Sequence, residues 1–387
     1  MNRAEQSFKQ NQHLIEVRHI NESDDQELRR LVSLPMTTRG LMLSFQREPS
    51  YFQASKVIYT KVDGTVAQDA NNGQLVGCYN IGLRPCYVNG QITALRYAGD
   101  LRLDPQVRGK AVLKQMVPHF RESLKDPNFC QMIIFNDNHA ARRAIQTGRL
   151  GFDYYDEGLI ETLTLTGFKQ SNFPSHVQSS TSSLDLKQID RCVAEAKYIP
   201  LMNDFIKRMA TRFNFVPAYD FHELEQQNSY FLGLALHDFQ LYFYQDQLVG
   251  MFGLWNQSSF KQSKVLGYSK KIQLFRPVYN LWAKLNGRIQ LPKKGHSFKY
   301  HILHSLLCEP EQLALHERML RDAFELSKQR GIDAITFTLS HKDPRQQLNQ
   351  FYKGDLLIGM HGFITFDQDP SAQFDSARIP FLEAGRI

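Results

Sequence analysis

The chain has 387 residues, of which 42% are hydrophobic and 22% charged, a composition typical of a globular protein and not of a disordered or fibrous one. This length exceeds that of one ordinary domain and suits two. The net charge of +7 favours anionic partners, but the basic residues form no dense run, so a nucleic-acid partner is not expected.

Two features that the sequence lacks limit its possible functions. No apolar run approaches the roughly 20 residues of a membrane span, and no apolar stretch near the N-terminus could serve as a secretion signal. We therefore expect a cytoplasmic protein with no membrane partner. The five cysteines are scattered, with no CxxC pair and no His/Cys cluster at zinc spacing, so we expect reduced thiols and no metal.

The N-terminal half predicts a helix, antiparallel strands and then an alternation of helices and strands. The first helix opens with capping-box spacing at Ser23 and carries its apolar residues on one face. Asn89-Gly90 supplies the positive φ angles of a tight hairpin turn between two strands. The predicted order is a helix ending before Pro35, strands over 55–63, 74–88 and 91–103, a helix over 112–124, a strand over 131–135, a helix over 138–146 and a strand over 161–165.

The second half repeats this order after a Ser-rich stretch that has the composition of a linker. The predicted elements are a hairpin over 241–244 and 247–255, a strand over 302–307, a helix over 311–330, a strand over 332–339 and a helix over 344–352. Both halves carry Gln-Leu-Val-Gly at corresponding places, 74–77 and 247–250, which favours an internal duplication.

These patterns predict an α+β protein with two domains, each a mixed, mostly antiparallel central sheet flanked by helices. The predicted division is a first domain over residues 1–168, a linker over 169–190 and a second domain over 191–387.

One short stretch lies between the end of a predicted strand and the start of a helix: Gln106-x-x-Gly109-x-Ala111. A helix start presents unpaired backbone N–H groups and the positive end of the helix dipole, which together suit a phosphate. Gly109 and the small Ala111 allow a phosphate to approach the backbone closely. Arg108 and Lys110 add positive charge beside it.

This stretch resembles the pyrophosphate-binding motif of the GNAT superfamily of acyl-CoA N-acyltransferases, (Gln/Arg)-x-x-Gly-x-(Gly/Ala). It lies where that family has the motif, between the fourth strand and the third helix. The family also places an Asn near the start of the next helix, where Asn138 lies, and a Gly-Phe at the end of the domain core, where Gly151-Phe152 lies. The resemblance covers about residues 15–166 by motif, and the second half by segment order only.

The resemblance implies that the first domain binds acetyl-CoA or another acyl-CoA, with the pantetheine arm running along the end of the fourth strand through main-chain groups. The residues that it assigns to the cofactor are Leu101, Arg102, Leu103, Gln106, Val107, Arg108, Gly109, Lys110, Ala111 and Asn138.

The second domain carries Cys308-Glu309-Pro310-Glu311-Gln312-Leu313 at the corresponding place. This segment has no glycine, and its two glutamates would repel a pyrophosphate. We expect the second domain to bind no coenzyme A and instead to cover the acceptor side of the first domain or to form a homodimer surface. On this basis residues 1–170 alone are predicted to retain coenzyme A binding.

Catalysis requires a group that accepts the proton of the amine. Asp100, late in the fourth strand, could do so directly or through a water, although a solvated carboxylate paired with Arg102 would have the same pattern. Many family members protonate the leaving thiolate with a Tyr seven residues after the Asn, but this position is Ile145 here, or Thr147 when counted back from Gly151. Either the thiolate leaves as an anion, or Tyr154 or Tyr155 protonates it, or these two tyrosines only pack within a strand.

Residues 36–52 fall where GNAT proteins often build the acceptor pocket. Arg39 and Arg47 could recognise a carboxylate or phosphate on the acceptor, although an amphipathic helix with a solvated face would have the same pattern. The sequence thus predicts transfer of an acetyl or other acyl group to the amine of a small molecule or amino acid. The open alternatives are a long-chain acyltransferase and a sensor that binds acyl-CoA without turnover; a tandem transferase using aminoacyl-tRNA is disfavoured by the coenzyme A loop.

Overall fold

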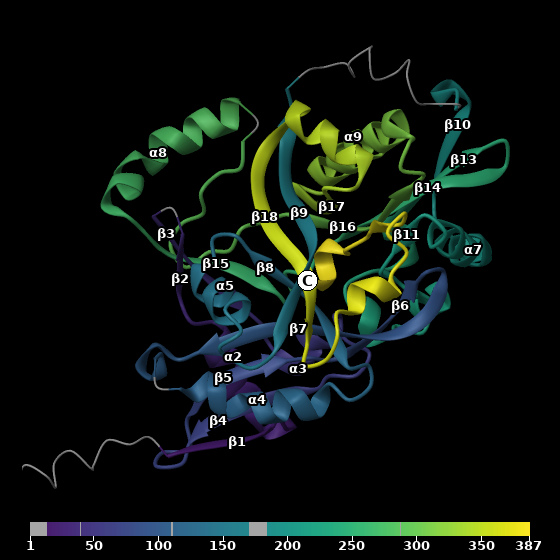
Figure 1. The fold of residues 1–387 in the computed structure, drawn as a ribbon. Helices are drawn as coiled ribbons and strands as arrows, with labels where there is room; N and C mark the ends of the chain where they lie inside the picture. The colour runs from purple at the N-terminus through teal and green to yellow at the C-terminus, as the bar shows by residue number, and fades with distance from the viewer. Residues whose placement is uncertain (1–13, 39, 110, 170–183, 287) are drawn as a thin grey trace, which may run out of the picture.

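The computed structural model describes residues 14–38, 40–109, 111–169, 184–286 and 288–387. A single 14-stranded sheet runs through both halves of the chain, with the strand order β1-β4-β5-β7-β8-β18-β9-β17-β16-β14-β13-β10 along its main path (Figure 1). The sheet is mostly antiparallel, and its parallel pairs are β7 with β8 and β16 with β17. The α+β class and the mixed, mostly antiparallel sheets flanked by helices are therefore confirmed.

The elements of the N-terminal half are β1 Ile15–His19, α2 Asp25–Val32, β2 Met36–Thr38, β3 Leu41–Gln46, α3 Tyr51–Ser55, β4 Gly64–Asp69, β5 Leu75–Asn80, β6 Leu83–Val88, β7 Gln91–Leu103, α4 Val112–Ser123, β8 Phe129–Phe135, α5 His139–Gln146 and β9 Asp153–Phe168. Those of the C-terminal half are β10 Ile189–Val193, α7 Ile199–Met209, β11 Phe213–Asn214, β12 Val216–Pro217, β13 Phe239–Tyr244, β14 Gln247–Trp255, β15 Gln262–Tyr268, α8 Lys270–Leu285, β16 His301–Cys308, α9 Leu313–Gln329, β17 Ile335–Ser340, a 3-10 helix Pro344–Phe351, β18 Tyr352–Thr365 and β19 Ile379–Pro380.

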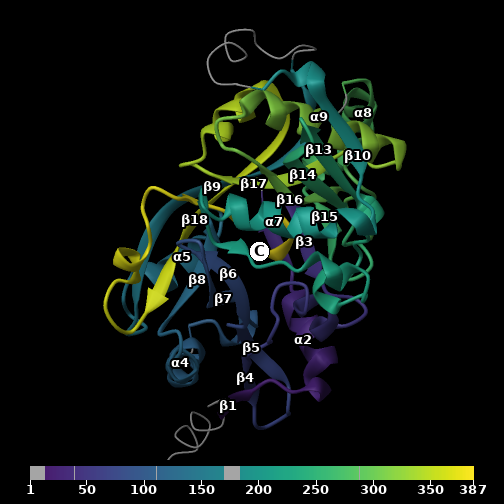
Figure 2. The same cartoon turned by 90° about the vertical axis from the view of Figure 1, so that its right-hand side faces the viewer.

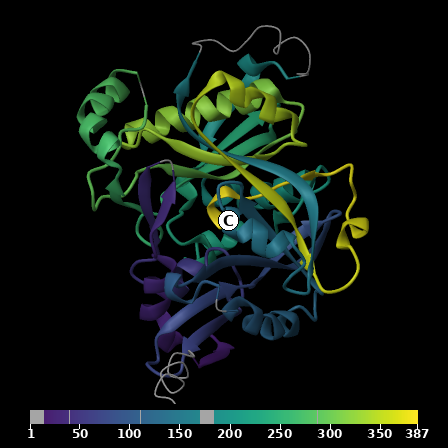
Figure 3. The ribbon, with the colours of Figure 1, turned by 60° about the vertical axis from the view of Figure 1, so that its left-hand side comes forward.

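Two long strands, β9 and β18, join the halves by exchanging places. They pair antiparallel along almost their whole length. The second part of β18, from Gly359 to Thr365, pairs with β8 of the N-terminal half, while β9 pairs through residues 160–165 with β17 of the C-terminal half. Each half therefore completes its sheet with a strand from the other, and Figure 3 shows the two strands crossing the molecule together.

The order of elements repeats about this exchange. The series β7-α4-β8-α5-β9 corresponds to β16-α9-β17, the 3-10 helix and β18. The two Gln-Leu-Val-Gly segments lie at β5 and β14, each the second strand of a hairpin, with β4 and β13 respectively. Figure 2 shows β1, β4 and α2 at one end of the molecule and β10, β13 and α9 at the other.

Helices cover both faces of the sheet. In the N-terminal half, α2 packs on the face that carries Val66 and Leu75, whereas α4 and α5 pack on the face that carries Ala67 and Val76. In the C-terminal half, α7 and α9 likewise belong to separate cores. This alternation of buried residues along each strand is what the two-residue period of a strand predicts for a sheet covered on both sides.

Several sequence predictions are confirmed closely. The hairpin turn at Asn89-Gly90 has φ angles of 51° and 81°, and Val88 pairs with Gln91 across it. Helices α4 and α5 and strand β8 lie within two residues of their predicted bounds or better. The predicted linker lies largely outside the described residues, and its last positions belong to a 3-10 helix and to β10.

Five predictions need correction. Residues 55–63 are not a strand, because α3 is followed by turns in which Ile58 N and Tyr59 N both donate to Ser55 O. Their apolar side chains pack in the core, although the backbone there does not form a strand. Residues 74–88 form two strands, and the strand at 161–165 is the middle of the longer β9. The first capping box is made by Asn21 and Asp24, so its N-cap lies two residues before the predicted Ser23. The segment 344–352 is a 3-10 helix rather than an α-helix.

The acceptor segment 36–52 is also not an amphipathic helix over most of its length. It forms the hairpin β2–β3, followed by the short α3. Strand β15 of the C-terminal half pairs with β3 to complete a small three-stranded sheet. Both halves therefore build this region together.

Candidate functional site

Strands β7 and β8 separate after a short parallel contact. Their pairing runs only from Arg96–Cys130 to Ala98–Met132. Beyond these pairs, β7 continues beside β5 and β8 continues beside β18, so the two strands part between Gly99 and Leu103 on one side. The opening presents main-chain groups that no strand in the described part of the chain pairs with.

A β-bulge in β7 lies at the start of this opening. Gly99 pairs with Asn80 and Arg102 with Cys78, so Asp100 and Leu101 fall between the two ladder contacts. Asp100 has a φ of 52°. The bulge turns the local backbone out of the regular ladder at Asp100 and Leu101.

The segment after β7 forms the loop that the sequence predicted for phosphate. Asp104 accepts a hydrogen bond from Gln106 N (3.0 Å), and Val107 is buried in the core below α4. Gly109 has a φ of 80°, and no atom lies within 4 Å of the place where a Cβ would be. Ala111 is also left-handed, with a φ of 60°.

Helix α4 then begins at Val112 with no side-chain cap. Its first N–H groups therefore face the space above the loop without a side chain to satisfy them. Arg108 is exposed beside that space. Lys110, the other predicted basic residue, lies outside the described residues.

Asp100 is paired with a different arginine from the one expected. Its carboxylate contacts Arg47 (3.3 Å) and accepts a hydrogen bond from Tyr51 Oη (3.3 Å). Arg102 instead donates to Leu101 O (3.0 Å) and points toward Met36 Sδ (3.6 Å). The structure thus brings together Asp100 and Arg47, which the sequence singled out separately. Arg39 lies outside the described residues.

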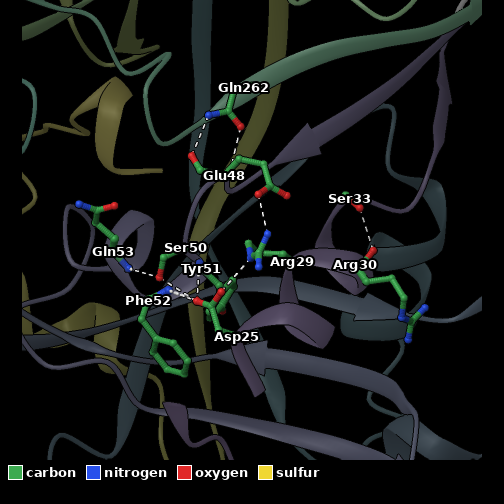
Figure 4. A network of polar contacts seen from close by, with 10 residues as sticks. All are labelled: Asp25, Arg29, Arg30, Ser33, Glu48, Ser50, Tyr51, Phe52, Gln53 and Gln262. Carbon is green, nitrogen blue, oxygen red and sulfur yellow. Dashed lines mark hydrogen bonds and ion pairs between the residues drawn. The ribbon is translucent and has the colours of Figure 1, made fainter. Parts of the chain in front are cut away.

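A polar network fixes the segment that carries Arg47 and Tyr51 (Figure 4). Asp25 accepts hydrogen bonds from Ser50 Oγ (2.7 Å) and Tyr51 N (2.9 Å), which ties α3 to the start of α2. Gln262 of β15 donates to Glu48 O (2.9 Å) and accepts from Glu48 N (3.2 Å). Contacts from both halves therefore hold this side of the site.

Lys261 is a functional candidate that sequence reasoning missed. The residue retains part of its surface, but its ammonium group is enclosed and donates to Gly385 O (3.3 Å). Burial, with the nearby charge of Arg47, lowers the pKa of Lys261 to about 7, and the carboxylate of Asp100 opposes this shift. No local signal marks Lys261, because its surroundings come from Arg47 after β3, from Asp100 in β7 and from residues 385–386.

Other predicted residues lie in structural roles. Asn138 caps α5, where its side chain accepts a hydrogen bond from Ala141 N (3.2 Å). Ile145 is buried in the core. Tyr154 packs beside that core, and its hydroxyl donates to Asp156 (3.4 Å). These contacts favour packing over proton donation for Tyr154.

The C-terminal half repeats the opening but fills it. Strands β16 and β17 pair only at His301–Ile335 and Ile302–Thr336, and Ser305 has a φ of 49° at an equivalent bulge. There, however, Ser305 N donates to the carboxylate of Glu383 (2.8 Å).

The loop equivalent to the phosphate loop is also occupied, by charge pairing within the protein. Arg212 lies 3.6 Å from Glu309 and also pairs with Glu311. The bulge N–H and the acidic loop of the C-terminal half thus already have partners within the chain.

Comparisons with known proteins bear on the fold of the chain. No family model matches the chain, and no curated protein matches it by sequence. A structure of Saccharomyces cerevisiae N-myristoyltransferase with bound myristoyl-CoA matches with a TM-score of 0.56 and 11% identity, over 95% of this chain and 85% of that one. A second structure of that enzyme with myristoyl-CoA matches with a TM-score of 0.54 and 10% identity, over 92% and 84%. The chain has a GNAT-type fold. The division into two tandem domains stays a prediction. Because the sequence identity is low, the likeness shows the fold alone, and the chemistry has to be argued from the residues of the site.

Proposed function

We propose that the chain is an acyl-CoA-dependent N-acyltransferase whose cofactor enters the opening between β7 and β8. The observation that carries the proposal is the continuity of this opening with the bulge at Asp100 and with the uncapped start of α4. Each part of acyl-CoA needs a different feature of the protein. The pyrophosphate suits a helix start, the extended amide chain suits a free strand edge, and the thioester suits main-chain donors.

The two left-handed residues explain how the phosphates would reach the helix start. Gly109 leaves open space where any side chain would stand, and the turn at Ala111 directs the first N–H groups of α4 toward it. Gln106, Val107 and Arg108 frame this loop. The pantetheine arm would then lie along the main chain of Leu101, Arg102 and Leu103, with no demand on their side chains.

The acyl end would emerge at the α2 and α3 side of the sheet, where Asp100, Arg47 and Lys261 gather. The amine nitrogen attacks the thioester carbonyl carbon, the C–S bond breaks, and the thiolate leaves with the bonding electrons. Either the neutral Lys261 amine or the Asp100 carboxylate accepts the proton of the amine. Asp100 already holds Arg47 and Tyr51, so Lys261 is the better base.

Acetyl-CoA, with a small amine or amino acid as acceptor, is the substrate pair that the sequence favours. A long-chain donor is the second candidate, because the structures with the same fold hold myristoyl-CoA. Calorimetry with acetyl-CoA and myristoyl-CoA separates the two, and release of free thiol with a panel of amines separates a transferase from a sensor. Binding of both donors without thiol release would contradict the enzymatic proposal.

Gly109→Glu tests the cofactor site. The new carboxylate would stand where the phosphates are proposed to lie, so we expect acyl-CoA affinity to fall by about a hundredfold or more. Gly331→Glu is a matched control, because Gly331 has a φ of 73° and equally open space. It introduces the same charge and similar backbone strain far from the site.

Calorimetry on the unmodified chain should give one acyl-CoA per chain, since the second opening is filled. Equal affinity in Gly109→Glu and Gly331→Glu, or two equivalent sites, would move the cofactor away from β7.

A further inference from the structure

Helix α8 turns an apolar face to the solvent. Its large exposed side chains, with the exposed fraction of each, are Leu274 (73%), Phe275 (63%), Val278 (68%), Leu281 (64%), Trp282 (49%) and Leu285 (78%). They recur at steps of one, three and four residues, which places them on one side of the helix. Figures 1 and 3 show α8 at the margin of the molecule, apart from the main sheet.

The opposite side of α8 attaches the helix to the protein through polar contacts. Asn280 donates to Leu291 O (2.9 Å) and accepts from Leu291 N (2.8 Å), and Tyr279 Oη donates to Ile289 O (3.4 Å). Ala283 is the buried residue of the helix. The usual arrangement of a surface helix, with the apolar face inward, is therefore reversed.

The chain segment that carries this face is basic, although the Asp355 carboxylate of β18 lies near Tyr279 of α8. From Gln247 to Cys308 the sequence contains no Asp or Glu, and besides the enclosed Lys261 it has nine Lys or Arg residues, which are Lys264, Lys270, Lys271, Arg276, Lys284, Arg288, Lys293, Lys294 and Lys299. Lys270 and Lys271 are exposed in the first turn of α8 and Lys284 in its last turn. Lys271 lies three and four residues before Leu274 and Phe275, in line with the apolar face.

We propose that α8 lies in the surface of an anionic lipid bilayer and attaches the protein to it. The apolar side chains would enter the boundary between head groups and acyl chains, and the lysines at both ends would reach the anionic head groups. Patches of this kind on a single chain mark an interaction surface.

A second copy of this chain is the less suitable occupant. In a two-fold contact through α8 the same patch would face itself, so the lysines at the ends of the helix would lie close to the lysines of the other copy. No helix among the described residues is both long and apolar enough to cross a membrane. The sequence-based expectation of no membrane partner concerned spanning segments, whereas the 16 residues of α8 would lie in the plane of the bilayer.

Tryptophan fluorescence of the full chain provides a direct test. The chain has two tryptophans. Trp282 lies on the apolar face, whereas Trp255 is fully buried and donates to Leu232 O (2.8 Å). We expect vesicles of phosphatidylglycerol and phosphatidylcholine to shift the emission to shorter wavelength, and vesicles of phosphatidylcholine alone to leave it nearly unchanged. Trp282→Phe should remove the shift while the protein still sediments with the anionic vesicles.

Variants separate the apolar and ionic contributions. Leu274→Gln combined with Leu281→Gln should weaken sedimentation with anionic vesicles by about tenfold or more, and so should raising NaCl from about 0.1 M to about 0.5 M. Ile92→Gln, at a position 62% exposed on β7, is the control for an apolar change elsewhere and should bind as the unmodified chain does. Absence of vesicle binding by the folded chain would overturn the proposal, as would equal binding to neutral vesicles. Self-association that the Leu274 and Leu281 changes abolish, without any lipid binding, would instead assign the face to a second copy.

Discussion

Lys261 and Asp100 come from different halves of the chain and meet beside the opening between β7 and β8. Lys261 is close enough to Asp100 for the carboxylate to counter part of the fall in its pKa, yet burial and Arg47 still hold that pKa near 7. A lysine amine that is neutral near pH 7 is a functional-site feature, because a general base must be unprotonated to act.

Replacing Lys261 with Met tests this role through pH. If Lys261 is the base, kcat/KM of the unmodified enzyme should rise with pH and level off just above 7, and Lys261→Met should lower kcat by about a hundredfold or more. Lys264→Met, on the neighbouring strand β15, is the control. A pH profile that is the same in Lys261→Met and in the unmodified enzyme would assign the proton transfer elsewhere.

The same residue predicts a pH dependence of stability. Between pH 7 and the usual lysine pKa of 10.5, the unfolded chain binds a proton at Lys261 that the folded chain does not. The free energy of unfolding should therefore rise with pH across this window, and the contribution is lost as the pH falls toward 7. Chemical denaturation should show that Lys261→Met stabilises the protein most at pH 7 and least near pH 10.

Sequence reasoning found residues whose signal is local and missed those whose surroundings are assembled from distant segments. Gly109 and Ala111 were recognisable because the spacing of the loop reflects backbone geometry within a few residues. The sequence singled out Asp100, but only the structure shows that its partner is Arg47. Lys261 carries no signal in its own neighbourhood, since a lysine before a strand is ordinary.

At the scale of elements, the short 3-10 helix Pro105–Val107 sets the direction in which the proposed phosphate loop leaves β7. Asp104 caps it through Gln106 N and also contacts Arg30 of α2 (3.5 Å). One side chain therefore links the loop to the face of the sheet that carries α2.

Asp104→Ala should loosen this loop. Loss of the cap costs about 1 kcal/mol in comparable cases, so we expect a destabilisation of that order in urea together with weaker acyl-CoA binding. Asp185→Ala removes a similar cap from the exposed 3-10 helix Leu186–Gln188 and should leave acyl-CoA affinity unchanged. Equal acyl-CoA affinity in the two variants would show that the loop does not depend on Asp104.

Local elements were also the most predictable part of the fold. The hairpin at Asn89-Gly90 and helix α4 follow from turn chemistry and from a periodic apolar stripe. Residues 55–63 were misassigned because β-branched and aromatic residues are enriched in buried positions of any conformation. The exchange of β9 and β18 has no local signature, because which strand becomes a neighbour in a sheet depends on topology rather than on the segment itself.

At the scale of the whole molecule, β18 lies between β8 and β9. An isolated N-terminal half would lack the strand that separates its own last two strands. Because of this exchange, we no longer expect residues 1–170 on their own to bind coenzyme A.

We expect residues 1–169 expressed alone to aggregate or to show no cooperative unfolding, because two strand edges and their apolar side chains would be bare. Co-expression with residues 184–387 should restore a soluble complex that binds acyl-CoA. Circular dichroism measures the cooperativity of unfolding, and calorimetry measures acyl-CoA binding, for both the fragment and the complex. A monodisperse fragment that binds acyl-CoA as tightly as the full chain would show that β18 is dispensable for the first half.

The same exchange governs the order in which the protein can fold during synthesis. Gln131 of β8 and His361 of β18 are hydrogen-bonded neighbours (2.8 Å) although 230 positions separate them. A ribosome releases β8 long before β18 exists, so the nascent N-terminal half must wait with an open sheet edge while the C-terminal half is translated. High contact order of this kind slows the closing step. The demand for chaperone protection should therefore fall mainly on the half that is made first.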